Sequence, residues 1–140
     1  MIENVKAIRE FAGDRAVLRA FHFFEENKRV DAEVEALEKK DFATFFNKIT
    51  ESGDSSWKWL QNCYCNETPD EQSITVALAL TKLYLDKIGR GVCRVHGGGF
   101  AGVIAAISSK RRKQKEFTKY IDKALGEGSA YVMHIRPQEP

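Results

Sequence analysis

The sequence predicts an α+β fold in which several helices pack on a small antiparallel sheet. Over roughly the first ninety positions, apolar residues recur at helical spacing. After Gly89 the pattern changes to the two-residue alternation that is typical of strands. A short run of glycines joins two strand-like segments, and neighbouring strands with so short a connection are antiparallel. Helices that cover one small sheet of this kind make an α+β sandwich.

The size and composition agree with one globular domain over residues 1–140. The chain has 140 residues, of which 43% are hydrophobic and 30% are charged. These values are ordinary for a folded protein and argue against disorder. A length of this order can bury a core without disulfides. The net charge of +2 is too small to imply a nucleic-acid partner by itself.

Two helices are predicted in the first forty residues. In the first, over residues 2–12, apolar side chains recur every three positions. Gly13 is expected to end this helix, and Asp14 is expected to cap the next one. That second helix runs from Arg15 to about Lys40 without a glycine or proline. It is the longest helix, and we expect it to be the scaffold of the domain.

Two further helices are predicted before the strands. One is expected to begin at a cap formed by Asp41 and to bury four apolar residues, and Gly53 is expected to weaken or end it. The other is expected to have Thr68 as its cap and Pro69 at its first helical position, and to end near Gly89. The four apolar residues of the buried stripe are Phe42, Phe45, Phe46 and Ile49.

Strands dominate the predicted C-terminal third. Residues 92–96 alternate as in a short strand, and residues 100–107 are rich in valine, isoleucine and alanine, as in a mostly buried strand. A last helix is predicted over residues 109–125. A final strand is predicted over residues 131–135, stopped by Pro137. This last helix is expected to lie across one face of the sheet.

The glycine run between the two strands is the most informative segment. Three consecutive glycines remove side chains and allow a positive φ, so the backbone can approach another backbone or a phosphate closely. A tight hairpin turn is the simpler interpretation. The run is not a P-loop, because the lysine and its spacing are missing. Nor is it a dinucleotide-binding fingerprint, because a strand and not a helix follows it.

The segment Gly97-Gly98-Gly99-Phe100-Ala101-Gly102 resembles the third signature motif of the GHMP sugar kinases. It is most similar to the version found in the galactokinases, Gly-Gly-Gly-Phe-Gly-Gly. The strands on either side also match, including Arg94 in the first of them. Ala101 stands where that motif has a glycine, and His96 stands where the family often has threonine.

Other segments are similar to galactokinases in the same order, over about residues 14–137. The run Ala36-Leu37-Glu38-Lys39-Lys40-Asp41-Phe42 is similar to the family's Ala-Leu-x-x-Gly-Asp-Phe. Thr50-Glu51-Ser52, followed by Ser55, resembles Met-x-Glu-Ser-His-x-Ser-Leu, with Gly53 at the histidine. The long second helix resembles a galactokinase helix with a His-then-Glu-then-Arg pattern. The residues that carry this pattern are His22, Glu25, Glu26 and Arg29.

The resemblance implies a GHMP kinase C-terminal domain, a ferredoxin-like plait with extra N-terminal helices. The family's sugar signature, its ATP-phosphate loop and the Asp and Arg near the transferred phosphoryl are not found in this sequence. ATP and Mg²⁺ are therefore implied for a cytoplasmic parent enzyme that makes galactose 1-phosphate, with neither bound to this chain alone. We expect no kinase activity from the chain and no catalytic residue in it. Gly97, Gly98, Gly99, Phe100 and Gly102 would support the nucleotide-phosphate site.

The partner that the resemblance implies is an N-terminal kinase domain. Without that domain an apolar face should be exposed, and a homo-oligomer would cover it. The alternative is a stand-alone, non-enzymatic α+β module that binds a metabolite or a partner protein through the glycine loop and the sheet face. A third possibility is a nucleic-acid-binding domain that uses the basic run Lys110–Lys115. A solvated helix face is favoured for that run, because basic runs more often serve that purpose. No aromatic residues interleave with it, so stacking on bases is not supported.

The three cysteines, Cys63, Cys65 and Cys93, are an odd number in a chain that can fold without them. Reduced thiols in a cytosolic protein are the plain interpretation. Cys63-x-Cys65 and Cys93-x-x-His96 together offer four zinc ligands, but we favour ordinary thiols and predict no metal. We also expect no signal peptide and no membrane span, because the longest apolar stretch is too short.

Overall fold

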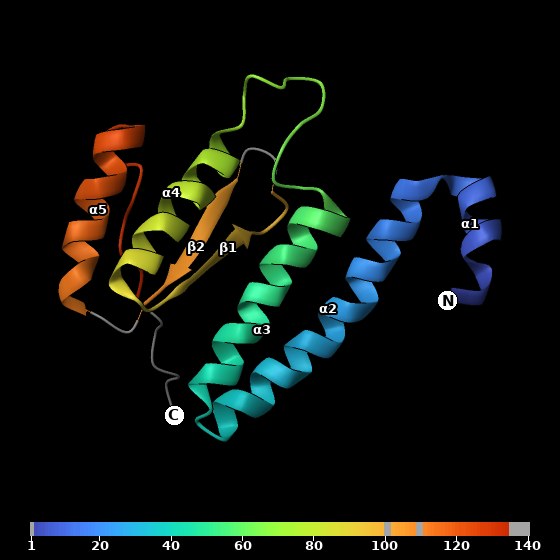
Figure 1. Ribbon diagram of the computed structural model, residues 1–140, viewed down its shortest axis with the longest axis horizontal. Coiled ribbons are helices and arrows are strands. Elements are labelled where there is room, and N and C mark those ends of the chain that lie inside the picture. The colour runs from blue at the N-terminus through green and yellow to red at the C-terminus, as the bar shows by residue number, and fades with distance from the viewer. Residues whose placement is uncertain (1, 100–101, 109–110, 135–140) are drawn as a thin grey trace.

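Five α-helices and a two-stranded antiparallel sheet make up the regular structure of the residues described, 2–99, 102–108 and 111–134, in a computed structural model (Figure 1). The predicted α+β class is therefore confirmed. A 3₁₀ turn, η1, precedes α1, and one π-helical turn, η2, follows α3. The elements are η1 (Ile2–Asn4), α1 (Val5–Ala12), α2 (Asp14–Glu38), α3 (Phe42–Ser55), η2 (Ser56–Leu60), α4 (Ser73–Ile88), β1 (Val92–His96), β2 (Val103–Ile107) and α5 (Arg111–Leu125).

The elements are arranged side by side, with the sheet between α3 and α4 (Figure 1). Helices α2 and α3 form an antiparallel pair, and α3 also contacts β1. On the other side α4 contacts both strands, and α5 packs on α4. Helix α1 lies at the far end, beside the beginning of α2. A small cluster of Cys63, Ile74 and Val95 forms the core between α4 and the sheet, with Tyr64, Leu78 and Ile104 packed around it.

The first helix boundaries follow the sequence closely. Gly13 ends α1 with a φ of 82°, and α2 begins directly after it. The prediction that Asp14 caps α2 is wrong, because Asp14 is the first helical residue and its carboxylate bonds to Arg9. Asp41 does cap α3, since its side chain accepts a hydrogen bond of 3.1 Å from the backbone N–H of Thr44.

Helix α3 differs from its prediction in two ways. It continues through Gly53 to Ser55, and it buries only part of the expected stripe. Ile49 is buried, Phe45 and Phe46 are half-buried, and Phe42 is exposed. Gly53 faces β1, and a Cβ on it would lie 3.1 Å from the Cβ of Arg94. The glycine therefore lets α3 approach the strand instead of breaking the helix.

Helix α4 begins later than predicted. Its first residue is Ser73 and its N-cap position is Gln72, so Thr68 and Pro69 are not its cap and first position. The backbone N–H of Glu71 instead bonds the carbonyl of Thr68 at 3.0 Å, which closes a turn ahead of the helix. The predicted end is correct, because Gly89 adopts the left-handed conformation there.

The two strands pair antiparallel, with Val92 opposite Ile107 and His96 opposite Val103. The prediction of a final strand is wrong for residues 131–134, which adopt no regular structure, and Ile135 lies outside the described residues. The chain turns after α5, and the backbone N–H of Ala130 bonds the Asp122 carboxylate at 3.1 Å. That bond ties the segment to α5 rather than to the sheet. Among the described helices, none combines the length and apolarity that a membrane span requires.

Candidate functional site

The glycine loop lies at the end of the sheet where β1 turns into β2 (Figure 1). Gly97 and Gly99 have φ values of 69° and 77°, which L side chains rarely adopt. The backbone N–H of Gly102 bonds the carbonyl of Gly99 at 3.1 Å and closes the turn. Phe100, which is predicted to begin the second strand and to support the nucleotide-phosphate site, lies outside the described residues, as does Ala101.

One side of the loop is packed tightly on the segment after α3. A Cβ on Gly99 would lie 2.0 Å from the backbone oxygen of Asn62, so only glycine fits there. The Asn62 side chain is 2% exposed, and its Nδ2 donates a hydrogen bond of 3.3 Å to the Gly98 carbonyl. Gln61, just before it, has a φ of 56°, which turns the chain toward the loop.

The other side of the loop is open. A Cβ added to Gly97 or Gly98 would meet no atom of the described chain within 4 Å. Both residues are exposed. Two consecutive glycines with a bare, accessible backbone can approach a second backbone or an anion closely.

A polar cluster lies behind the loop, where α2, α3 and β1 meet. Arg94 of β1 donates from Nη1 to Glu26 Oε1 of α2 at 3.0 Å, and also to the hydroxyl of Ser52 on α3. The Ser52 hydroxyl also bonds Glu26, and Ser52 is fully buried. Arg29 completes the cluster with a bond of 2.9 Å from Nε to Glu26 Oε2. One carboxylate therefore joins three elements that are distant in sequence.

The surroundings of this cluster set its charge states. Burial alone would raise the pKa of Glu26, but hydrogen bonds from Ser52 and Arg29 and the charge of Arg94 together hold it below its ordinary value. Burial lowers the pKa of the neighbouring His22, whose Nδ1 lies 2.9 Å from the hydroxyl of Ser55. Glu26 is thus an ionised structural anchor, and His22 is favoured as the neutral imidazole.

The structure brings together residues that the sequence analysis took from separate segments. The His-Glu-Arg pattern of α2 meets the serines of α3, and both meet the strand arginine that precedes the glycines. Sequence reasoning missed the contact of Asn62 with Gly99, for which the sequence offers no pattern. It also missed the pairing of Arg94 with Glu26, although an arginine inside a strand-like apolar segment signals a need for a buried partner.

The thiols lie in different surroundings. Cys63 is buried, and burial raises its pKa. Burial also raises the pKa of Cys93, to about 11. Hydrogen bonds from the Glu67 backbone and from Thr68 hold the pKa of Cys65 below its usual value. The described residues contain no group of three or more His, Cys, Asp or Glu side chains that could hold a metal ion.

The basic run at the beginning of α5 is partly engaged within its own helix. Lys113 pairs with Glu116 at 2.6 Å, and Lys115 is exposed. Lys110 lies outside the described residues, and α5 begins at Arg111.

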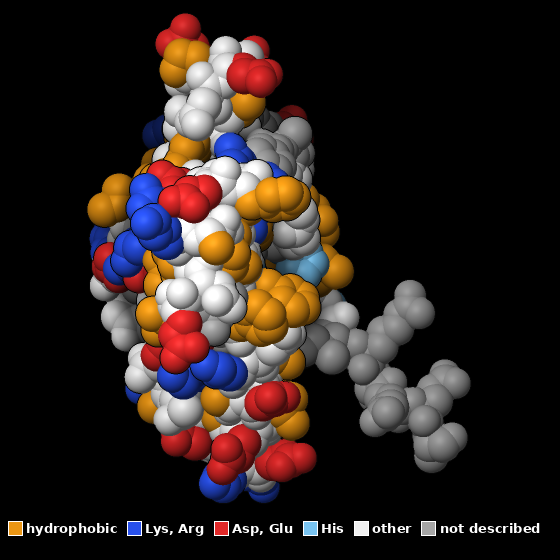
Figure 2. All heavy atoms as spheres, turned by 90° about the vertical axis from the view of Figure 1, so that its right-hand side faces the viewer, with side chains coloured by type: hydrophobic (Ala, Val, Ile, Leu, Met, Phe, Trp, Pro, Cys, Tyr) orange, Lys and Arg blue, Asp and Glu red, His pale blue; other side chains and the backbone are white. Residues whose placement is uncertain are grey.

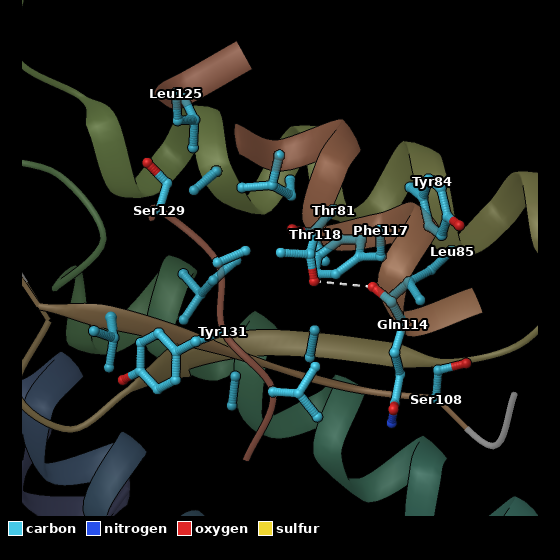
Figure 3. Close-up of a pocket in the computed structure, with 18 of the residues that line it drawn as sticks. Thr81, Tyr84, Leu85, Ser108, Gln114, Phe117, Thr118, Leu125, Ser129 and Tyr131 are labelled. Atoms are coloured by element: carbon cyan, nitrogen blue, oxygen red, sulfur yellow. Dashed lines mark hydrogen bonds between the residues drawn. The ribbon is translucent and has the colours of Figure 1, made fainter. Parts of the chain in front are cut away.

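A cavity of about 640 Å³ lies between α4, α5, β2 and the segment after α5 (Figure 3). Its wall is mostly apolar, and Leu85, Phe117 and Ile121 contribute to it. Thr118 also lines it, but its hydroxyl is already bonded to the Gln114 carbonyl at 2.9 Å. The volume lies in the range of small-molecule sites, and the lining also includes polar side chains such as Tyr84, Lys113 and Gln114.

No protein-family model matches the sequence, and a search of curated proteins finds no significant match.

Proposed function

We propose that this chain is the C-terminal domain of a galactokinase-like GHMP sugar kinase. In this proposal the glycine loop supports the nucleotide-phosphate site of a parent enzyme that converts ATP and galactose to galactose 1-phosphate. The observation that supports this proposal is that the segments that resemble galactokinases lie together in the structure. Motif residues of α2 and α3 and the strand before the glycines meet in one polar cluster. A cluster of this kind fixes the strand from which the loop extends.

The two sides of the loop fit a supporting role. Gly99 anchors the loop on Asn62, whereas Gly97 and Gly98 leave their backbone accessible to a neighbouring domain. In this proposal the loop only positions the neighbouring nucleotide site. Its neutral backbone groups cannot replace the Mg²⁺ and cationic side chains that phosphoryl transfer needs. We assign ATP and Mg²⁺ to the N-terminal domain of the parent enzyme, as the resemblance to the GHMP kinases implies.

The chain alone should release no ADP in a coupled assay with galactose and Mg-ATP. The same chain joined to a galactokinase N-terminal domain should show galactose-dependent turnover. Turnover by the chain alone would contradict the assignment, as would a joined enzyme that folds, binds ATP and stays inactive.

Two glycine variants separate loop anchoring from loop function in that joined enzyme. Gly99→Ala should destabilise the isolated chain, because its Cβ would collide with the Asn62 backbone. Gly98→Ala has open space around it, so the isolated chain should keep its urea midpoint. In the joined enzyme Gly98→Ala should still lower turnover, because its methyl group would face the adjoining domain. If Gly98→Ala left the turnover of the joined enzyme unchanged, the loop would not be part of the nucleotide site.

A second candidate is the stand-alone module that binds a metabolite, and the cavity of about 640 Å³ favours it. The genomic sequence upstream of Met1 discriminates between the two proposals. A Pro-x-x-x-Gly-Leu-Ser-Ser-Ser-like stretch in frame would support the kinase domain. A stop codon just upstream would support the module.

A further inference from the structure

The cavity between α4, α5, β2 and the segment after α5 has different surroundings at its two ends (Figure 3). At one end lie Leu125, the last residue of α5, and Ser129 in the segment that follows. At the other end lie Gln114 of α5, Ser108 after β2 and Tyr84 of α4. The cavity therefore runs along α5 from one end of the helix to the other.

Between these two ends the wall of the cavity is mostly apolar. Ala77 of α4 and Phe117 and Ile121 of α5 contribute to it. The lining residues of α5 extend from Lys113 to Leu125, which corresponds to about 18 Å along the helix axis. A cavity of about 640 Å³ that extends over such a length is narrow. A linear aliphatic chain fits this shape, and its burial against apolar side chains is favourable.

The end of the cavity near Gln114 is strongly basic. Helix α5 carries six basic and two acidic side chains. Four of the basic ones are among its first five residues, which include no acidic one, and the charges of the remaining ten residues cancel. Lys113, in this first group, lines the cavity. The adjacent end of α4 does not neutralise the group, because Asp86 is paired with Lys82 at 2.6 Å. The excess of positive charge favours an anionic group at this end.

Lys113 is positioned at the cavity by its backbone and keeps donors for a ligand. The Tyr84 hydroxyl donates a hydrogen bond of 3.3 Å to the Lys113 carbonyl, and the Tyr84 ring packs on Phe117. Lys113 Nζ pairs with Glu116 at 2.6 Å, but both side chains are partly exposed, so the pair is weak. An ammonium group has three N–H donors, so Lys113 can bind a second carboxylate beside Glu116. Gln114, which also lines the cavity, has an amide that can donate to a carboxylate.

We propose that this cavity binds a fatty acid, with the aliphatic chain between α4 and α5 and the carboxylate at Lys113 and Gln114. The inference rests on the second candidate function, the binding of a metabolite, and it names the class of that metabolite. It also gives the basic run at the beginning of α5 a role, which the kinase proposal does not.

Isothermal titration calorimetry of the full chain with dodecanoate, below the concentration at which micelles form, tests the proposal. We expect one saturable site per chain. Dodecan-1-ol has the same chain without the charge and should bind about tenfold more weakly, because it makes no charge-assisted hydrogen bond with Lys113. Butanoate has the charge without the long chain and should not saturate the site at the same concentrations.

A lysine variant tests the position of the carboxylate. Lys113→Gln should weaken the binding of dodecanoate several-fold and leave the binding of dodecan-1-ol unchanged, because only the charge is removed. Lys115→Gln is the matched control, because Lys115 is exposed on the same helix and does not line the cavity. It should leave the binding of both ligands unchanged.

An alanine variant tests the position of the aliphatic chain. Ala77→Phe should fill part of the cavity and weaken the binding of dodecanoate and dodecan-1-ol alike. Ala79→Phe is the matched control, because Ala79 is exposed on α4 outside the lining. Circular dichroism checks that both variants fold. Lys113 is partly exposed, so Lys113→Gln remains a valid test if Ala77→Phe disrupts the packing.

Three results would overturn the fatty-acid site. The first is a wild-type chain that binds no dodecanoate. The second is an equal response of dodecanoate binding to Lys113→Gln and Lys115→Gln. The third is equal affinity for dodecanoate and dodecan-1-ol, which would exclude a carboxylate ligand but keep the cavity as a metabolite site. The second candidate function fails separately, if the sequence upstream of Met1 encodes the kinase domain in frame.

Discussion

Two threonines of α4, Thr75 and Thr81, differ in whether their hydroxyl groups are hydrogen-bonded within the described residues. Thr81 is fully buried, and its Oγ1 has no hydrogen-bond partner among the described residues. Thr75 donates from Oγ1 to the Cys63 carbonyl at 3.1 Å, which ties α4 to the segment after α3. A buried hydroxyl without a partner loses its hydration and gains nothing in return.

Thr81→Val should therefore stabilise the protein, by about 1 kcal/mol, because the shape is kept and the unpaired hydroxyl is removed. Thr75→Val, the matched control, should lower the free energy of unfolding by about the same amount, because the Cys63 carbonyl loses its donor. Urea unfolding of both variants measures the difference. Loss of stability in Thr81→Val would show that its hydroxyl is bonded in solution.

Residue-level prediction from the sequence worked where the signal is local. The Asp41 cap, the end of α1 at Gly13 and the end of α4 at Gly89 all depend on one residue and its neighbours. It failed where a distant segment decides the outcome. Gly53 is needed because β1 approaches α3 there, and a helical pattern carries no information about that approach.

Among the elements, α2, α3 and β1 are joined through Glu26, and this link predicts a pH dependence. The pKa of Glu26 is lowered in the folded state relative to its ordinary value of 4.5. A lowered carboxyl pKa adds stability above the unfolded-state pKa, and this stability is lost as the pH falls through the folded-state pKa. The link should therefore weaken in acid, below about pH 4.5.

Glu26→Gln should remove that part of the pH dependence. The free energy of unfolding of the variant should lie below that of the wild type near pH 7, and the two should converge as the pH falls below about 4.5. Urea titrations between about pH 3 and pH 7 measure the gap. Glu10→Gln, on the exposed face of α1, controls for the loss of a carboxylate. A gap of constant size across the range would exclude Glu26 as its source.

Element boundaries were predictable to the extent that side-chain periodicity sets them. The pairing of β1 and β2 followed from two apolar segments and a short glycine connection, and it is confirmed. The beginning of α4 and the final strand were not predictable in this way. A turn bond at Thr68 delays the helix, and the Asp122 carboxylate binds the chain at Ala130.

On the scale of the whole molecule, α1 contributes little to the core. No residue of α1 is buried, and the helix lies at the far end of the row of elements (Figure 1). Deletion of residues 1–12 should therefore change the free energy of unfolding by less than about 1 kcal/mol. Urea unfolding of the shortened chain checks this. A loss of several kcal/mol would mean that α1 packs on the body of the protein in solution.

The fold class was predictable because the change from helical to alternating periodicity at Gly89 is a property of the whole sequence. Helix α2 shows the limit of prediction from periodicity, because some of its apolar residues are exposed (Figure 2). Periodicity predicts that Val17 and Val34 are both apolar positions of one helix. It does not show which of the two the rest of the chain covers. Only the packing of α3 separates the covered face from the exposed one.

The two-stranded sheet has a consequence for how the newly synthesised chain folds. β2 pairs with β1 on one edge, and within the described residues no strand pairs with its other edge. Its sequence, Val-Ile-Ala-Ala-Ile, has no charge and no proline to discourage the addition of foreign strands, and Val103 and Ile107 are partly exposed. The yield of native protein after synthesis therefore depends on how soon another segment shields β2, and an unshielded β2 is where aggregation would begin.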